Sequence, residues 1–248
     1  IKSKMDTSKE DNHRFIIFDI GGVIANGFNN HLIAEHLKTA NEKKLKGVFD
    51  LSRKLFASYK VGEIDEDGYW KGLLENETFE QKIIEQKLIN EKDTMEERLE
   101  KIKADLRENH VRVDYRTLGY IQELSELYKD VPNVHLGILS NHTHEWFSHL
   151  FKRFNLNLYF TEEPIVICSA AVEAAKPNPK IFKILYERCN KVAGGNLNPK
   201  NITFIDDKEA NILAAKTEGM NGFVYNFRKK ELRSIDRLGK LIQKHISM

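Results

Sequence analysis

Hydrophobic residues in this chain occur either in short unbroken runs or in longer stretches with a helical period. The short runs predict strands that are buried on both faces, as in a parallel sheet covered by helices. Strands are expected at 15–18, 135–139, 158–160, 165–168, 202–205 and 222–225. Helices are expected at 115–129, 143–154, 181–190 and 208–216, before a last helix that buries Leu232, Ile235, Leu238, Leu241 and Ile242. This alternation predicts an α/β fold with a doubly wound parallel sheet.

A long segment with helical periodicity follows the first predicted strand. Its apolar residues share helix faces, which are formed by Leu32, Ile33, His36 and Leu37 and then by Val48, Leu51, Leu55 and Phe56. Asp65 is a suitable N-cap for a helix whose Tyr69 and Trp70 are expected to pack inside. A charged helix is expected over 79–106, broken near 90–93. The predicted domains are a flexible leader at 1–12, a core at 13–27 and 111–248, and a helical domain at 28–110.

A carboxylate follows the first predicted strand. Asp19 comes directly after the apolar run at 15–18 and shortly before Gly21 and Gly22. A charged side chain there is costly to bury unless a cation or ligand meets it. Ligands of open α/β sheets bind at the carboxyl ends of the strands, and the glycines let the backbone approach them closely. The alternative is an aspartate that caps a turn after an edge strand.

Two adjacent carboxylates end a later strand. Asp206 and Asp207 follow the run at 202–205 and precede a helix that should end near Gly219. One acid would be enough to N-cap this helix, so the second needs another explanation. If the two lie beside Asp19, three close carboxylates result, and these cannot all stay ionised without a counterion. Oxygen ligands, without Cys and His at metal-binding spacing, favour Mg2+ over zinc.

Two further segments offer groups that bind anions. Ser140 and Asn141 end the run at 135–139, and their side chains suit phosphate oxygens together with backbone N–H groups of the following helix start. Lys176 precedes a Pro-x-Pro turn at 177–179 and can act as a point charge on phosphate. A lysine before a proline is more often simply solvated, so only the order of all these segments is a strong signal.

This order of Asp19, Ser140, Lys176 and the Asp206–Asp207 pair resembles the haloacid dehalogenase-like (HAD) hydrolase superfamily, and the likeness covers nearly the whole chain. The resemblance implies that Asp19 and Lys176 are catalytic. By the same resemblance, the phosphate-binding residues are Ser140, Asn141, Lys176 and Gly22. The implied Mg2+ ligands are Asp19, Gly21 through its carbonyl, Asp206 and Asp207. The segment 28–110 lies where the superfamily places a helical cap, which excludes water and selects the substrate.

Gly21 departs from the pattern of the phosphatases in this superfamily. They usually carry a second aspartate at this place, which serves as general acid and base. Such help is typically worth about a hundredfold to ten-thousandfold, so slow turnover is expected unless another group substitutes. His142 and His144 are candidates by their ordinary pKa, although solvated histidines are the expected outcome. The motif at 18–23 is similar to a branch that includes α-D-glucose-1-phosphate phosphatases, whose leaving group needs little protonation.

The resemblance implies a Mg2+-dependent phosphatase of a small phosphorylated metabolite, in which Asp19 forms an aspartyl-phosphate that water then cleaves. One alternative is a weak or inactive relative with a binding or regulatory role, which Gly21 supports. Another is a 2-haloacid dehalogenase, but that chemistry needs no metal and leaves Asp206 and Asp207 unexplained.

Composition changes this interpretation little. The 248 residues carry a formal net charge of +2, which gives no reason to expect nucleic-acid binding. No apolar run approaches membrane-spanning length, and the N-terminus has no signal-peptide core, so no membrane association is expected. Cys168 and Cys189 are expected to be buried, reduced thiols of a cytoplasmic protein. A monomer and a homodimer are equally compatible with the sequence.

Overall fold

The computed structural model describes residues 12–26, 45–229 and 234–247. Several expectations fall outside these residues: the leader apart from Asn12, the helix face that includes Leu32 and Leu37, and Leu232.

Five parallel strands form one sheet in the order β3-β2-β1-β4-β5. Their bounds are β1 Arg14–Phe18, β2 Val134–Ser140, β3 Val166–Cys168, β4 Ile202–Asp206 and β5 Asn221–Val224. Phe18 at the end of β1 pairs with Ile138 of β2 and with Ile205 of β4. The carboxyl ends of these three strands therefore lie side by side, and the predicted doubly wound parallel sheet is confirmed.

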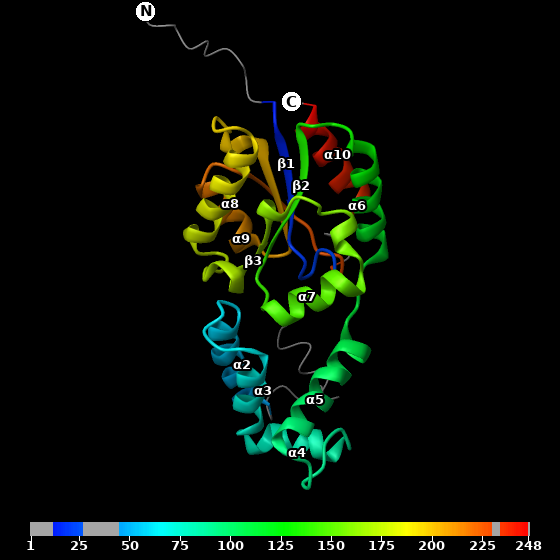
Figure 1. The fold of residues 1–248 in the computed structure, drawn as a ribbon, viewed down its shortest axis with the longest axis vertical. Coiled ribbons are helices and arrows are strands. Elements are labelled where there is room, and N and C mark those ends of the chain that lie inside the picture. Colours follow the sequence, from blue (N-terminus) through cyan, green and yellow to red (C-terminus); the bar gives the residue numbers. More distant parts are fainter. Residues whose placement is uncertain (1–11, 27–44, 230–233, 248) are drawn as a thin grey trace, which may run out of the picture.

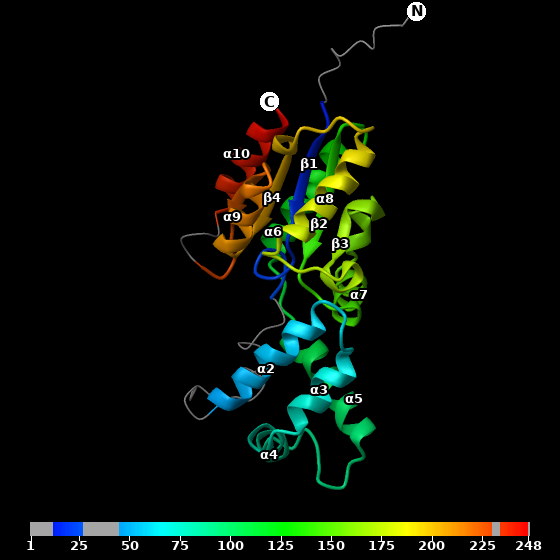
Figure 2. The ribbon, with the colours of Figure 1, turned by 90° about the vertical axis from the view of Figure 1, so that its left-hand side faces the viewer.

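Helices cover both faces of the sheet (Figures 1 and 2). They are α6 Tyr115–Tyr128, α7 His144–Arg153, α8 Pro179–Val192, α9 Glu209–Thr217 and α10 Ile235–Ile246. Alternate residues of β1 pack against the helices on opposite faces of the sheet. Ile16 and Phe18 belong to the buried cluster that contains residues of α6, α7 and α10, whereas Phe15 and Ile17 belong to the cluster with α8 and α9. This double burial explains why β1 is apolar without alternation.

The predicted strand at 158–160 is wrong. A 3-10 helix spans Leu156–Leu158, and the N–H groups of Tyr159 and Phe160 both bond the Leu156 carbonyl, so they close a turn rather than a ladder. Of residues 158–160, only Phe160 is buried, and Leu158 is 61% exposed. A three-residue apolar run can thus place a single anchor in the core without pairing to a strand.

In the described part of the chain, helices α2 to α5 lie beyond the carboxyl ends of the strands (Figure 1). They are α2 Lys46–Tyr59, α3 Glu66–Leu74, α4 Glu77–Glu85 and α5 Met95–Asp105, followed by a π-helical turn at Leu106–His110. The Asp65 carboxylate accepts a hydrogen bond from Gly68 N at 2.7 Å, which confirms the predicted N-cap of α3. Tyr69 and Trp70 are fully buried, as expected. The break in the charged helix is wider than predicted, because Thr94 starts a new helix with its own capping box.

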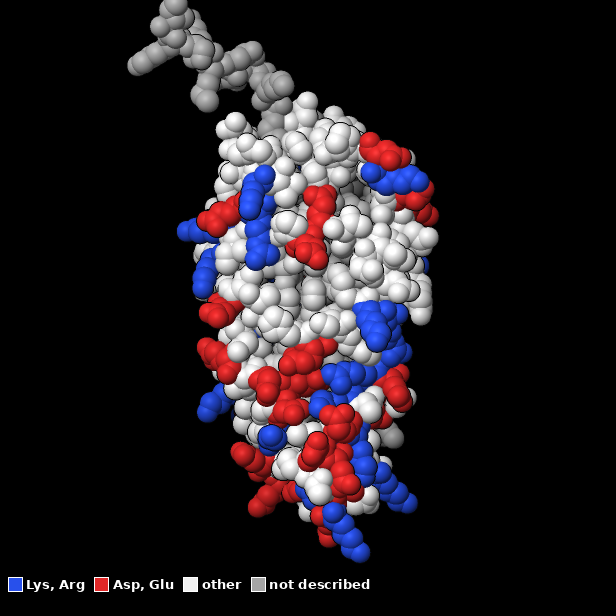
Figure 3. All heavy atoms as spheres, viewed as in Figure 1, with Lys and Arg blue, Asp and Glu red and all other residues white. Residues whose placement is uncertain are grey.

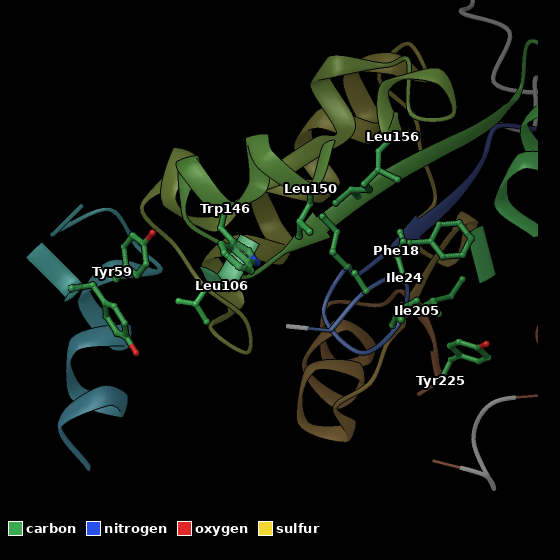
Figure 4. Packing of buried hydrophobic residues seen from close by; sticks show 14 of the residues in the cluster. Phe18, Ile24, Tyr59, Leu106, Trp146, Leu150, Leu156, Ile205 and Tyr225 are labelled. Atoms are coloured by element: carbon green, nitrogen blue, oxygen red, sulfur yellow. The ribbon is translucent and has the colours of Figure 1, made fainter. Parts of the chain in front are cut away.

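A hydrophobic cluster joins the helical segment, which is described at 46–110, to the core. One buried cluster contains Tyr59 of α2, Leu106 and Trp146 of α7, and it continues to Phe18 and Ile205 in the sheet (Figure 4). The two parts therefore share a hydrophobic interior.

Acidic and basic side chains are mixed on the face shown in Figure 3, most densely over the helical segment. Among the described residues, no helix combines the length and apolar character that crossing a bilayer requires. Cys168 and Cys189 are buried and unpaired, as expected.

Candidate active site

The ends of β1 and β2 bring Asp19 and Ser140 into contact. Ser140 Oγ donates to Asp19 Oδ1 at 2.6 Å, and Ile20 N donates to the same oxygen at 2.8 Å. Asp19 is buried, and it lies at the carboxyl end of the central strand. The aspartate that the sequence singled out is thus held by fixed donors at the edge where α/β sheets bind ligands.

Lys176 joins this pair to the end of β4. Its Nζ lies 3.0 Å from Asp19 Oδ1 and 2.7 Å from Asp206 Oδ2, and it donates to the Leu139 carbonyl at 2.7 Å. Burial alone would lower the pKa of Lys176, but the two carboxylates outweigh it, so the pKa is raised above its ordinary value. Lys176 is therefore a buried permanent cation, and not the solvated lysine that its position before a proline makes more common.

Asn141 holds the loop that carries this lysine. Its Oδ1 accepts from Lys176 N at 2.9 Å, and its Nδ2 donates to the Lys176 carbonyl at 2.8 Å. The side chain predicted to bind phosphate is therefore used to position Lys176. The backbone N–H of Asn141 has no hydrogen-bond partner within the described part of the chain.

The two acids after β4 have different surroundings. Asp206 accepts from Lys208 N at 2.8 Å and from the Asn211 amide at 2.9 Å. Burial raises the pKa of Asp206, and although Lys176 opposes this, the nearby Asp19 adds to it. Asp207 has one oxygen, Oδ1, that is buried and makes no hydrogen bond to the described chain. Burial and the nearby Asp19 raise the pKa of Asp207 to about 6.

These three carboxylates form a donor set that fits a hard divalent cation. Asp19, Asp206 and Asp207 each offer an oxygen, and the three ligand atoms lie within 4.8 Å of one another. The bare Asp207 Oδ1 and the raised pKa values of Asp206 and Asp207 both indicate negative charge that the protein's own groups do not fully compensate. Mg2+ prefers such oxygen ligands.

The two glycines after Asp19 have separate roles. Gly22 has φ +81°, and a Cβ placed on it would lie 2.6 Å from Asp207 Oδ2. Its N–H donates to the Ala25 carbonyl at 2.7 Å, so the amide expected to bind phosphate is already used. Gly21 is not among the positive-φ residues, and its N–H has no partner in the described chain. Gly21 therefore offers the site a backbone donor, whereas Gly22 provides space.

A cavity of about 460 Å³ opens above these residues, between the helical segment and the core. Asp19, Gly21, Lys176 and Asp207 line it from the core. Sequence reasoning missed several basic residues of its wall, since no motif marks them: Arg53, Lys60, Lys208 and Arg228.

His142 lines the same cavity, and the expectation that it is solvated is wrong. It is 1% exposed, and neither ring nitrogen has a hydrogen-bond partner in the described chain. Burial, together with Lys176 and Lys208, lowers the pKa of His142 to about 3, so the ring is neutral at physiological pH. His144 is exposed on the first turn of α7, as expected.

The family model described as haloacid dehalogenase-like hydrolase matches residues 16–224, and the chain belongs to this family. Among curated proteins, none matches the chain.

Solved structures share the fold at low sequence identity. A HAD family enzyme from Bacteroides thetaiotaomicron, in complex with magnesium and inorganic phosphate, is 21% identical with a TM-score of 0.61, covering 90% of this chain and 100% of its own. The HAD-hydrolase YfnB from Bacillus subtilis, bound to magnesium, is 16% identical with a TM-score of 0.59, covering 93% and 99%. A dehalogenase is 14% identical with a TM-score of 0.57, covering 96% and 98%.

Proposed function

We propose that this HAD-like hydrolase is a Mg2+-dependent phosphatase that acts on a small phosphorylated metabolite through an aspartyl-phosphate. The observation that carries the proposal is the cluster of Asp19, Asp206 and Asp207 around one point, beside the buried cation Lys176. Three carboxylates this close need a cation as counterion, for which Mg2+ is suited. Such a bound cation would in turn hold the anionic phosphate of an ester next to Asp19.

The contacts of Asp19 divide the work between its two oxygens. Oδ1 accepts hydrogen bonds from Ser140 Oγ and Ile20 N and pairs with the Lys176 ammonium. Oδ2 has no hydrogen bond from the described chain, and we assign it as the nucleophile. It forms the new bond to phosphorus while the ester P–O bond breaks, and water later cleaves the aspartyl-phosphate.

The phosphoryl oxygens would be held by donors that the protein does not use for itself. The free N–H groups of Gly21 and Asn141 and the ammonium of Lys176 are suited to stabilise charge on these oxygens. Bound Mg2+, held by Asp19, Asp206, Asp207 and the Gly21 carbonyl, would neutralise further phosphate charge.

We also propose that the helical segment, predicted at 28–110, acts as a cap over this site. Residues of α2 line the cavity opposite Asp19, so movement of this segment would admit or enclose a substrate. In the Bacillus subtilis relative, the magnesium-bound crystal structure reveals interdomain movement.

Several observations bear on the alternatives. Gly21 offers no side-chain acid, and His142 is neutral, so a catalytically weak or inactive relative remains the main competitor. The structural likeness to a dehalogenase favours the third alternative, but that chemistry leaves the buried, unpartnered oxygen of Asp207 without a role.

Phosphate release from p-nitrophenyl phosphate tests the proposal, because the nitrophenolate leaves without protonation and needs no general acid. We expect activity that requires Mg2+, disappears in Asp19→Asn and persists in the matched control Asp130→Asn, at an exposed position. No phosphate release would favour the inactive relative, and metal-independent chloride release from a 2-haloacid would establish the dehalogenase.

A further inference from the structure

We propose that the cavity holds a second anion subsite, formed by Lys60, Lys208 and His142, so that the preferred substrate is a phosphate ester with a second negatively charged group. This inference rests on the proposed phosphatase function and specifies its substrate class. The second group is a carboxylate or a phosphate, since both present the same anionic oxygens to these donors.

The two lysines come from opposite sides of the cavity. Lys60 is the C-cap residue of α2, and Lys208 follows the acid pair of the core. No ion pair or side-chain hydrogen bond of either ammonium occurs within the described residues. Both lysines line the same cavity. Burial lowers the pKa of Lys60, and repulsion by the charge of Lys208 lowers it further. An anion between them would relieve this repulsion.

Backbone contacts hold both lysines in place. The Lys60 carbonyl accepts a hydrogen bond from Ser169 Oγ of the core at 2.5 Å. The Lys208 N–H donates to Asp206 Oδ1 at 2.8 Å. These contacts fix the backbone at both positions, so Lys60, which is half-buried, and Lys208, which is exposed, extend into the cavity from anchored points.

His142 supplies the independent observation. It lines the cavity, it is almost completely buried, and both of its ring nitrogens lack a partner in the described chain. A buried polar group without a partner is rare in folded proteins and calls for a ligand or water. As a neutral ring, His142 has one N–H to donate to an anionic oxygen.

These side chains differ from the groups assigned to the transferred phosphate, although they line the same cavity and the charge of Lys208 also opposes the rise in the pKa of Asp207. Lys176 is already paired with Asp19 and Asp206, and the nearby N–H groups of Gly21 and Asn141 are available for the phosphoryl oxygens. Lys60 and Lys208 would add two positive charges that a phosphate ester with a neutral remainder does not need. Arg53 is not counted, because it pairs with Asp50.

The test compares matched substrates of two lengths. Glycerol 3-phosphate is paired with 3-phosphoglycerate, which differs by a carboxylate, and fructose 6-phosphate is paired with fructose 1,6-bisphosphate. We measure kcat/KM for each by phosphate release in the full chain with Mg2+. In at least one pair, the substrate with the second anion should be preferred by about tenfold or more, as for other charge-assisted contacts. A preference in the first pair would identify the second group as a carboxylate, and a preference in the fructose pair would identify it as a phosphate.

The variant Lys60→Met should lower this preference ratio by about tenfold, and Lys60→Arg should restore most of it. Lys54→Met is the matched control, because it removes the same charge from an exposed position on the same helix. Equal kcat/KM within both pairs, or an unchanged ratio in Lys60→Met, would overturn the subsite. If no compound, p-nitrophenyl phosphate included, releases phosphate, the phosphatase proposal fails. Calorimetric titration of the same pairs then tests the subsite by itself: tighter binding of the doubly anionic member, lost in Lys60→Met, supports it, and equal binding overturns it.

Discussion

Gly22 and Asp207 are in such close contact that a single methyl group would not fit between them: a Cβ on Gly22 would lie 2.6 Å from Asp207 Oδ2. Gly22 also has a positive φ, which costs other residues about 1–2 kcal/mol. We therefore expect Gly22→Ala to destabilise the fold by at least this amount and to remove phosphatase activity by displacing Asp207.

Gly194→Ala separates the cost of the positive φ from the effect of the contact with Asp207. Gly194 has a similar φ of +85°, but a Cβ there would meet nothing within 4 Å. Urea unfolding should show the backbone cost in both variants, whereas only Gly22→Ala should lose activity. Equal activity in the two variants would mean that the Gly22–Asp207 contact does not matter for the site.

Lys176→Met should destabilise the protein strongly, because it leaves Asp19 and Asp206 buried beside each other without their cation. Breaking a buried ion pair on one side costs about 3–5 kcal/mol, and activity should be lost as well. Lys183→Met, at an exposed position of α8, is the control and should stay within about 0.5 kcal/mol of the wild type. A loss of less than about 1 kcal/mol in Lys176→Met would refute the structural role given to the lysine.

Gly21→Asp should raise the turnover of alkyl phosphates, whose leaving groups need a proton. The backbone at Gly21 does not have a positive φ, so a side chain is compatible with it. If the missing general acid is limiting, the gain should approach about a hundredfold. Gly21→Asn is the control, because it has the same shape without the acid. An equal rate in both variants would mean that the substrate or another group already meets this need.

The stabilisation of the protein by Mg2+ should grow with pH. Without metal, the pKa of Asp207 is raised to about 6, so this group contributes stability only while protonated, and the contribution is lost as pH rises through about 6. Mg2+ requires the ionised carboxylate. The rise in Tm on adding Mg2+ should therefore be larger at about pH 7.5 than at about pH 5.

Asp207→Asn should nearly remove this Mg2+ effect at both pH values, while making the metal-free protein less sensitive to pH. A Mg2+-induced rise in Tm that is the same at both pH values in the wild type would contradict the assignment of Asp207 to the metal site.

The sheet and the three carboxylates could be predicted from the sequence because their signals are local. An apolar run such as 15–18 or 202–205 predicts a buried strand, and in a parallel sheet all such strands end at one edge. Asp19, Ser140 and Asp206 therefore had to lie close together once the strands were known. The apolar run at 158–160 is not a strand, because three apolar residues are equally compatible with a turn that has one buried side chain.

Other parts of the site depend on contacts between segments that are distant in sequence, and no local sequence pattern predicts them. His142 is buried in the wall of a cavity that α2 also lines, and the end of α2 at Lys60 is bonded to Ser169 of the core. Likewise, the use of Asn141 to hold Lys176 follows from a loop that returns from 35 residues away.

The buried cluster that joins Tyr59 and Trp146 to Phe18 also governs how this molecule comes apart. Because the same apolar interior belongs to the sheet and to the inserted helices, neither part can melt without exposing surface of the other. Heat should therefore unfold the described chain in one cooperative calorimetric peak. A destabilising substitution anywhere in that interior should lower the Tm of this single transition.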